Sequence, residues 1–299
     1  MDWKILSDRT LAGGSVSRDE ALAVLQSSDD ELLGLLQEVF RVRQKHHGRR
    51  VDLHVIRNAK SGLCPENCSF CSQSASATTP ITEYPMQEET DLIEGARRAH
   101  ASGAVRYCMV TSGRGPRDAE VDEICRTVRQ IKKEVSIEIC TSLGLLTADQ
   151  ARRLAEAGVD RVNHNVESSR RFFPQIVTSH TYDERRETLR IAKAAGLELC
   201  CGGILGLGET LEDRVDMAFE IAELDVDSIP VNLLDPRPGT ALETRPRMTP
   251  AEALRALAMF RWVMPSKEIR VAGGREACLR SLQPLALFAA NSIFTEGYL

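Results

Sequence analysis

The feature that most restricts the fold of this chain is a regular alternation, from Val51 onward, of short β-branched segments with longer amphipathic ones. Short runs rich in Val, Ile and Thr are typical of buried strands, whereas apolar residues at helical spacing are typical of helices that cover a sheet. Eight strands are therefore predicted, at residues 53–57, 106–110, 137–141, 161–166, 197–202, 228–233, 268–271 and 290–294. The helices predicted between these strands cover residues 88–101, 119–133, 148–157, 182–195, 211–223, 250–262 and 279–287.

Strands that alternate with helices pair in parallel through right-handed crossovers. Eight such units predict an α/β fold, a (β/α)8 TIM-type barrel, with its functional side chains at the carboxyl ends of the strands. Two more helices are predicted ahead of the barrel, at residues 18–27 and 29–44. We therefore expect an N-terminal helical extension over residues 1–50 and a single barrel domain over residues 51–299.

The charge and hydropathy of the chain exclude several classes of partner. Its formal net charge is −5, which argues against nucleic acid because phosphate binding draws on clustered Lys and Arg. The sequence contains no run of about 18 apolar residues, the length that a membrane-spanning helix needs. Its first residues also lack the basic and apolar parts of a secretory signal. We expect a cytoplasmic protein, in which nine cysteines more often mean metal binding or catalysis than disulfides.

Three cysteines follow the first predicted strand with the spacing Cys-x3-Cys-x2-Cys, namely Cys64, Cys68 and Cys71. Three thiolates can hold three irons of a 4Fe-4S cluster and leave the fourth iron open to a small molecule. The amino and carboxylate groups of S-adenosylmethionine suit that open position. A zinc site is the alternative, in which a remote Cys or His would complete the set, although zinc ribbons usually have two separated Cys pairs.

This spacing, after the first strand of such a barrel, resembles the radical S-adenosylmethionine superfamily. Five segments, in their order along the barrel, narrow the resemblance to the biotin synthase family: residues 59–74, 107–109, 163–165, 202–210 and 270–276. The similarity runs from about Leu53 to Tyr298. It implies an oxygen-sensitive enzyme that binds a 4Fe-4S cluster through the three cysteines and cleaves S-adenosylmethionine.

A second set of candidate ligands lies on four different predicted strands and consists of Cys108, Cys140, Cys200 and Arg270. Such side chains meet inside a barrel only if every one of them points inward. Taken alone, each cysteine is a small buried hydrophobe and the arginine is the partner of a carboxylate or phosphate. In the biotin synthase family, three cysteines and one arginine at the matching positions hold a 2Fe-2S cluster, so the resemblance implies that cluster here. A structural role is expected for Cys125, Cys201 and Cys278, with the alternative that a bulge presents Cys201 to the barrel interior in place of Cys200.

Contacts to the S-adenosylmethionine cofactor are implied by the same resemblance. The glycine-rich segment 202–209 alone is a weak phosphate motif, but its family counterpart contacts the adenine, here through Ile204. Thr111 and Ser112 match the place where the methionine amino group binds, and Phe70, between two of the cysteines, is expected to bind the same cofactor. Glu167 is expected to bind the ribose, although many relatives have Asp at this position.

Amide side chains are the candidate substrate ligands. Alternation along the fourth predicted strand places Asn163, Asn165 and Glu167 on one face. Amides donate and accept at once, which suits both ribose hydroxyls and the ureido ring of dethiobiotin. The resemblance assigns Asn165 to cofactor and substrate together, and Asn163 and Asn232 to the substrate. His164 is expected to point outward with its hydrogen bonds satisfied.

The resemblance thus implies a sulfurtransferase that converts dethiobiotin to biotin. An electron from the first cluster would cleave S-adenosylmethionine, the deoxyadenosyl radical would take hydrogen from dethiobiotin, and the substrate radical would take sulfur from the second cluster. An electron donor such as flavodoxin or ferredoxin and a homodimer are further expectations.

Two other functions are compatible with part of the sequence. A radical enzyme that assembles a hydrogenase cofactor would share the barrel and the first cysteines, but would leave the second set of candidate ligands unexplained. A non-catalytic iron or zinc carrier would leave the asparagines and the glycine-rich segment without a purpose. The chain ends directly after the eighth predicted strand, where a short C-terminal lid is a further expectation.

Overall fold

The computed structural model describes residues 1–62 and 64–296. Leu63 and residues 297–299, where the predicted family similarity ends, lie outside the described residues. Within the described residues, parallel strands form one sheet that closes on itself, in the order β5-β4-β3-β2-β1-β9-β8-β7-β6 with β5 also paired to β7. The strands are β1 (Asp52–Lys60), β2 (Arg106–Thr111), β3 (Glu138–Ser142), β4 (Arg161–Asn163), β5 (Glu198–Cys200), β6 (Gly203–Leu205), β7 (Ser228–Leu233), β8 (Glu268–Val271) and β9 (Ser292–Glu296).

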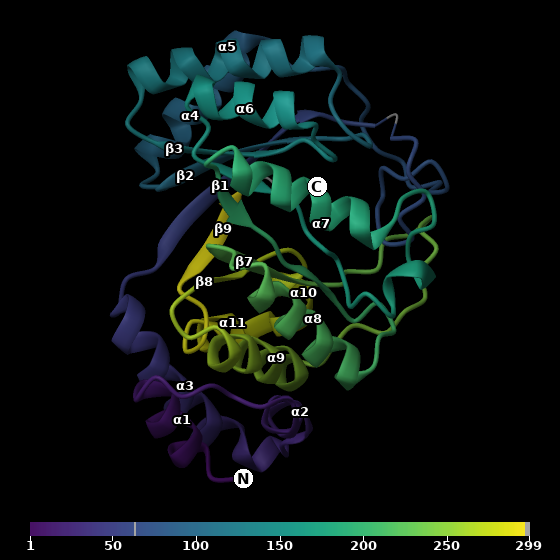
Figure 1. Cartoon of the computed structure of the whole chain (residues 1–299). Helices are drawn as coiled ribbons and strands as arrows, with labels where there is room; N and C mark the ends of the chain where they lie inside the picture. Colours follow the sequence, from purple (N-terminus) through teal and green to yellow (C-terminus); the bar gives the residue numbers. More distant parts are fainter. Residues whose placement is uncertain (63, 297–299) are drawn as a thin grey trace.

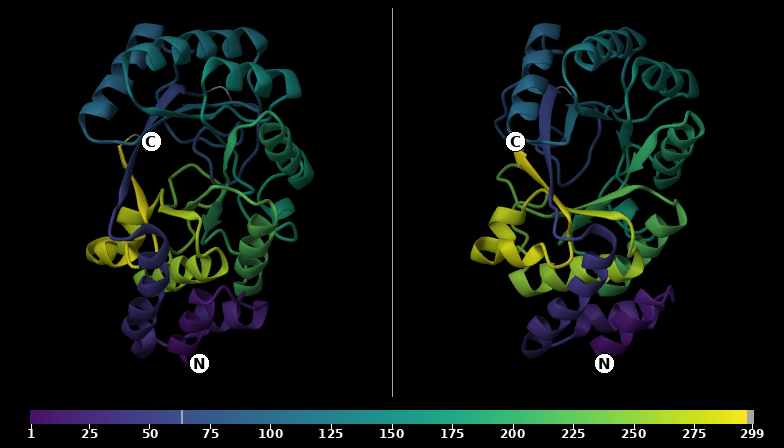
Figure 2. Two further views of the ribbon diagram at one scale, coloured as in Figure 1. Left: turned by 60° about the vertical axis from the view of Figure 1, so that its left-hand side comes forward. Right: turned by 90° about the vertical axis from the view of Figure 1, so that its left-hand side faces the viewer.

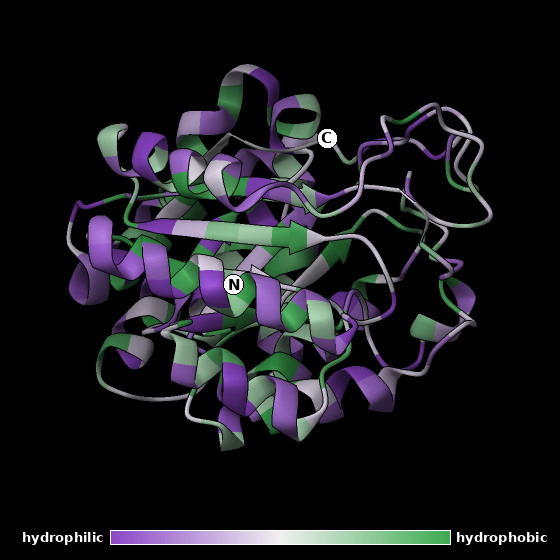
Figure 3. Ribbon diagram, turned by 90° about the horizontal axis from the view of Figure 1, so that it is seen from above, coloured by the Kyte–Doolittle hydropathy of each residue, from purple (hydrophilic) through white to green (hydrophobic). Residues whose placement is uncertain are grey.

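Helices alternate with these strands and surround the closed sheet (Figures 1 and 2). The predicted (β/α)8 barrel is therefore confirmed. The central strand arrow in Figure 3 points toward the side where the long connections gather, which is the side of the carboxyl ends. In chain order the helices after β1 are α4 (Glu89–Ala101), α5 (Asp118–Glu134), α6 (Ala148–Ala157), α7 (Tyr182–Ala194), α8 (Leu211–Glu223), α9 (Pro250–Val263), α10 (Arg275–Leu279) and α11 (Gln283–Ala286).

Threonine side chains begin four of the barrel helices. Each accepts a hydrogen bond from the backbone N–H three residues on and is met in return by the side chain at that position; the four are Thr147, Thr181, Thr210 and Thr249. This capping box satisfies backbone donors that a helix end otherwise leaves without partners. The starts of α6, α7, α8 and α9 consequently lie at the predicted residues.

The fifth barrel position differs from the single strand predicted over residues 197–202. It contains β5 and β6, which pair with β7 at Cys200↔Ser228 and Gly203↔Val231, so the register is unchanged across the break. The break includes Gly202, where a Cβ would lie 1.9 Å from the Pro230 carbonyl oxygen. Only glycine permits this close approach.

The carboxyl-terminal part also differs from the prediction of one helix over residues 279–287. The structure has α10, a 3-10 turn over Arg280–Leu282 and then α11. Arg280 has a φ of 52°, in the left-handed region that interrupts a helix. The last strand consequently begins at Ser292, two residues later than predicted.

Three helices precede the barrel, and the sequence predicts two of them: α1 (Trp3–Leu11), α2 (Arg18–Gln26) and α3 (Leu32–His47). The helix α1 is the unexpected one, and α3 begins later than predicted because a 3-10 turn precedes it. The three lie beside α8 and α9, outside the ring of strands (Figure 1). Trp3 stacks on Trp262 with 6.1 Å between the ring centroids. No helix in the described part of the chain is long and apolar enough to cross a lipid bilayer.

Candidate active site

Two adjoining cavities lie in the barrel interior and at its mouth. The inner cavity has an open volume of about 750 Å³ and is lined by alternate residues of successive strands. The mouth cavity, of about 870 Å³, is lined by the loop after β1 and by the connections after β2, β3 and β4. The two cavities adjoin each other, because Val110, Ser142, Asn163 and Asn165 line both of them.

The loop after β1 places three predicted iron ligands on the wall of the mouth cavity, beside Phe70: Cys64, Cys68 and Cys71. Burial raises the pKa of the Cys68 thiol to about 12 and also raises the pKa of Cys71. Metal binding would therefore release protons from these thiols. Three sulfur donors on one open cavity fit a 4Fe-4S cluster, which takes thiolate ligands and needs space at its remaining iron. Over residues 1–62 and 64–296, no three Cys, His, Asp or Glu side chains converge closely enough to hold a single metal ion.

The segment ahead of α7 holds this cysteine loop in place. The Asn67 side-chain oxygen accepts from the backbone N–H groups of Thr178 and Ser179, both at 3.0 Å. The buried Glu66 carboxylate accepts from the Ser179 hydroxyl and contacts His180 Nδ1. Although burial opposes ionisation, these hydrogen bonds lower the pKa of Glu66. The cysteine loop is thus fixed by a segment more than a hundred residues away in the chain.

A bulge at the end of β4 directs Glu167 toward the mouth cavity. The strands β4 and β5 pair at Asn163↔Cys200, whereas the next bridge is Glu167↔Gly203, so one extra residue lies on the β4 side. Glu167 has a φ of 69°, and burial raises the pKa of its carboxyl. The ladder is regular up to Val166, and both Val166 and Glu167 donate their backbone N–H groups to the Gly202 carbonyl, at 3.0 and 3.3 Å. The predicted alternation is therefore interrupted only at Glu167, and all three predicted side chains line the two cavities.

His164 precedes this bulge, and the expectation that its hydrogen bonds are satisfied is wrong for Nε2. The side chain is buried in the wall of the mouth cavity. Burial holds its pKa well below the usual value, so the ring is neutral. Its Nε2 has no hydrogen-bond partner among the residues that the structure describes.

The other predicted cofactor ligands divide between the mouth cavity and the fifth barrel position. Thr111 and Ser112 line the mouth, where the Ser112 hydroxyl donates to the Gly62 carbonyl at 2.6 Å. Ile204 lies on β6 opposite Asn232 in the register and is absent from the lining of both cavities. The structure therefore brings together the predicted ligands except Ile204.

The barrel interior brings together the second set of predicted ligands. Cys108 and Cys140 stand opposite each other in the β2–β3 register, and their hydrogen bond raises the pKa of Cys108 and lowers that of Cys140. Arg270 Nη1 lies 3.6 Å from the Cys200 sulfur. Cys201, next along the chain, packs with the apolar core instead. Three buried thiols from three strands fit iron–sulfur ligation, and the guanidinium beside Cys200 is the fourth group of the set that the family resemblance implies for a 2Fe-2S cluster.

Charged side chains surround Arg270. Although burial opposes ionisation, Arg270 and His54 hold the pKa of Glu268 well below its usual value. Burial and the nearby guanidinium lower the pKa of His54 to about 4. Attraction to Glu268 raises the pKa of Arg270 despite burial. A carboxylate and a guanidinium therefore lie beside a neutral imidazole at neutral pH.

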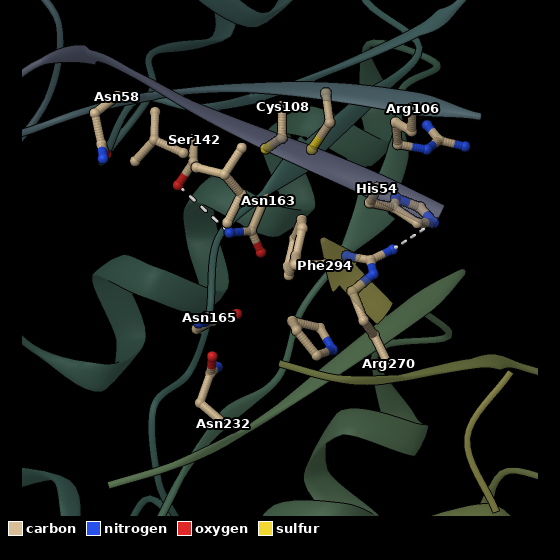
Figure 4. Close-up of a pocket in the computed structure, with 14 residues that line it drawn as sticks. His54, Asn58, Arg106, Cys108, Ser142, Asn163, Asn165, Asn232, Arg270 and Phe294 are labelled. Atoms are coloured by element: carbon tan, nitrogen blue, oxygen red, sulfur yellow. Dashed lines mark hydrogen bonds between the residues drawn. The ribbon is translucent and has the colours of Figure 1, made fainter. Parts of the chain in front are cut away.

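Asparagine side chains line the inner cavity (Figure 4), and two of them, Asn163 and Asn165, line the mouth cavity as well. Asn163 donates to the Ser142 hydroxyl at 3.4 Å, and its carbonyl oxygen is buried with no hydrogen-bond partner in the described part of the chain. Backbone N–H groups donate to Asn165 at 3.1 Å and to Asn232 at 2.9 Å. A buried acceptor without a partner indicates a ligand that donates a hydrogen bond.

Comparison with known proteins points in the same direction as this geometry. Residues 60–221 match the Radical SAM superfamily, and residues 230–299 match the Biotin and Thiamin Synthesis associated domain. The chain is 52% identical to a biotin synthase of Salinibacter ruber, over 99% of this chain and 83% of that protein. It is 50% identical to a biotin synthase of Halalkalibacterium halodurans, over 100% of this chain and 90% of that protein. It is also 50% identical to a biotin synthase of Bacillus subtilis, over 99% of this chain and 89% of that protein. The chain belongs to the biotin synthase family.

Solved structures share the barrel of this biotin synthase family member. Methylornithine synthase superposes with a TM-score of 0.85, over 97% of this chain and 85% of that chain, at 22% identity. The FeFe-hydrogenase maturase HydG from Carboxydothermus hydrogenoformans has a TM-score of 0.83, over 99% and 71%, at 17% identity. At such identities these likenesses show the fold alone.

Sequence reasoning missed several side chains of this biotin synthase family site. Arg185 donates to the Asn165 carbonyl at 2.8 Å and to His180 Nε2 at 2.9 Å, and thereby connects the end of β4 to the cysteine loop. The sequence signal that could have identified Arg185 and His180 was their position after the fourth predicted strand, because sites in such barrels lie at the carboxyl ends of the strands. No local signal marks Glu268 or His54, because each resembles an ordinary residue of a strand.

Proposed function

We propose that this chain inserts sulfur into dethiobiotin to form biotin, as a radical S-adenosylmethionine sulfurtransferase. The observation that carries the proposal is the shared wall of the two cavities, where Asn163 and Asn165 line both. A substrate held at this wall would lie between the two sets of thiols. When bound, the 4Fe-4S cluster supplies the electron that cleaves S-adenosylmethionine, and the 2Fe-2S cluster supplies the sulfur.

The cysteines divide between the two clusters in this proposal. The 4Fe-4S cluster is held by Cys64, Cys68 and Cys71, and the 2Fe-2S cluster by Cys108, Cys140, Cys200 and Arg270. The first three line the mouth cavity, open to a further ligand. The second set is buried, which would exclude water from the place of sulfur transfer.

The cofactor ligands belong to the mouth of the barrel. We propose that S-adenosylmethionine contacts Phe70, Thr111, Ser112, Asn165, Glu167 and Ile204. The Glu167 carboxylate, which accepts from Arg185 at 3.4 Å, is held where it can accept from the ribose hydroxyls. Ile204 contributes an apolar surface at the fifth barrel position, and its role depends on the family resemblance.

Three amides would bind the substrate: Asn163, Asn165 and Asn232. The buried carbonyl oxygen of Asn163 can accept from a ureido N–H of dethiobiotin. Backbone hydrogen bonds already hold the other two side chains, so little side-chain freedom is lost when a ligand binds.

The domain organisation and the partners complete the proposal. Residues 1–50 form a helical extension of a barrel domain over residues 51–299, supported by the packing of α1, α2 and α3 outside the ring of strands. Electrons come from a donor such as flavodoxin or ferredoxin, and the enzyme is a homodimer, as in the family that the chain resembles.

Anaerobic reconstitution with iron and sulfide, followed by incubation with S-adenosylmethionine, a reductant and dethiobiotin, tests the proposal. Biotin and deoxyadenosine should form together. Deoxyadenosine without biotin would assign the radical chemistry to another substrate, and zinc in place of iron would refute the whole proposal.

Cysteine variants separate the roles of the two cavities. Cys108→Ala should abolish biotin formation and the 2Fe-2S absorption. Cys125→Ala is the matched control, because Cys125 is a buried cysteine of α5 whose thiol donates to the Arg153 carbonyl at 3.4 Å, outside both cavities. It should retain both clusters and biotin formation.

A further inference from the structure

One partly buried carboxylate beside Arg270 has no part in the chemistry above. Glu268 precedes Arg270 by two residues on β8, so both side chains point into the barrel. We propose that Glu268 is a positioning residue that orients the Arg270 guanidinium toward the 2Fe-2S site, an inference that rests on the function proposed above.

The Glu268 carboxylate bridges three strands across the barrel. Its Oε1 accepts from Arg270 Nη2 and lies 3.1 Å from His54 Nε2 on β1. Its Oε2 accepts from Arg161 Nη1 on β4 at 2.7 Å. Because one carboxylate connects β1, β4 and β8, it cannot move without disturbing all three contacts.

These contacts determine how the guanidinium is turned. Arg270 Nη2 donates to Glu268 and to the Ser228 hydroxyl, the latter at 3.0 Å. A guanidinium is planar and rigid, so anchoring one nitrogen fixes the direction of the others. The opposite nitrogen, Nη1, consequently faces the Cys200 sulfur at 3.6 Å. Figure 4 shows Arg270 reaching from its strand toward His54 inside the inner cavity.

Glu268 is also the less exposed of the two carboxylates that balance the charge of the Arg161 and Arg270 guanidinium groups. Arg161 and Arg270 are both buried, where like charges repel more strongly than in water. The other carboxylate that bonds Arg161 is Glu198, whose side chain is 47% exposed, against 14% for Glu268. Without the Glu268 charge, Arg270 would be repelled by Arg161 and would turn toward other acceptors.

Glu268→Gln keeps the size of the side chain and removes its charge. In anaerobically reconstituted protein, we expect an iron chelator to remove the 2Fe-2S cluster about tenfold faster or more, because residues that orient metal ligands typically change metal affinity about 10–100-fold. The absorption and Mössbauer spectra of this cluster should change as its arginine ligand moves. The spectra of the 4Fe-4S cluster should stay the same, which provides an internal control.

Glu198→Gln is the matched control variant. Glu198 belongs to the same charged group and bonds Arg161 at 2.7 Å and Arg106 at 3.2 Å, but its contacts are with these two residues and not with Arg270. This variant should release the 2Fe-2S cluster at the wild-type rate and keep its spectra.

Each outcome decides a different question. Wild-type release rates and spectra in Glu268→Gln would overturn the inference and leave the proposed function standing, whereas a wild-type protein that binds no 2Fe-2S cluster would overturn both. Loss of both clusters in Glu268→Gln would indicate a misfolded barrel, and Glu268→Asp then decides. It keeps the charge but shortens the reach to Arg270, so altered 2Fe-2S spectra support positioning and unaltered spectra overturn it.

Discussion

Glu120 connects the end of β1, directly before the cysteine loop, to the first turn of α5. Its side chain is 6% exposed and accepts from Lys60 Nζ at 2.8 Å and from the Arg117 backbone N–H at 2.8 Å. Although burial opposes ionisation, these hydrogen bonds lower the pKa of Glu120 from 4.5 to about 2. Replacing this carboxylate with the amide in Glu120→Gln removes the charge and keeps the shape.

The pKa difference sets the expected cost of that substitution. A difference of about 2.5 units corresponds to about 3 kcal/mol of unfolding free energy at 1.36 kcal/mol per unit. Because the folded-state pKa is lowered, this contribution is complete above pH 4.5 and is lost as the pH falls through 4.5 toward about 2. Glu120→Gln should therefore cost about 3 kcal/mol at pH 7 and about 1.4 kcal/mol at pH 3.

Urea unfolding of the metal-free chain at several pH values, followed by circular dichroism, measures this cost. Glu94→Gln is the control, because the Glu94 side chain is 49% exposed beside Arg97 and its loss should change stability by less than about 0.5 kcal/mol. The reasoning is refuted by a difference that stays constant from pH 7 to pH 3, or by equal stabilities of Glu120→Gln and wild type at pH 7.

Three further experiments test the loop, the second set of thiols and the N-terminal helices. Glu66→Gln weakens the hydrogen bonds that anchor the cysteine loop, because a hydrogen bond to a charged group contributes about 1.5–3 kcal/mol. An iron chelator should therefore remove the iron of the 4Fe-4S cluster about tenfold faster, while the absorption of the 2Fe-2S cluster stays unchanged. Cys200→Ala should abolish the 2Fe-2S signal and Cys201→Ala should retain it, and the reverse result would exchange their roles. Trp262→Ala removes a buried ring that stacks on Trp3 and should cost about 3–5 kcal/mol in urea unfolding, with faster proteolysis of α1; unchanged proteolysis would show that α1 is held by other contacts.

Short-range patterns predicted most of the barrel and the first set of thiols. Four helices begin at the predicted residues, where each has a threonine cap that acts on a backbone amide only three residues away. The strands at residues 228–233 and 268–271 lie where their apolar runs predicted them. The cysteines of the mouth cavity were found from their spacing alone, since all three belong to one loop.

The amino-acid sequence by itself therefore determined the strand and helix order and the local groups of candidate ligands. Only the tertiary structure decided the bulge at Glu167, the break at Gly202 beside Pro230, and the ion pair of Arg161 with Glu268 across 107 residues of chain. Buried charges and close backbone contacts depend on which atoms meet in space and on the loss of water there. No pattern of neighbouring residues contains that information, so the charged surroundings of Arg270 became visible only in the folded barrel.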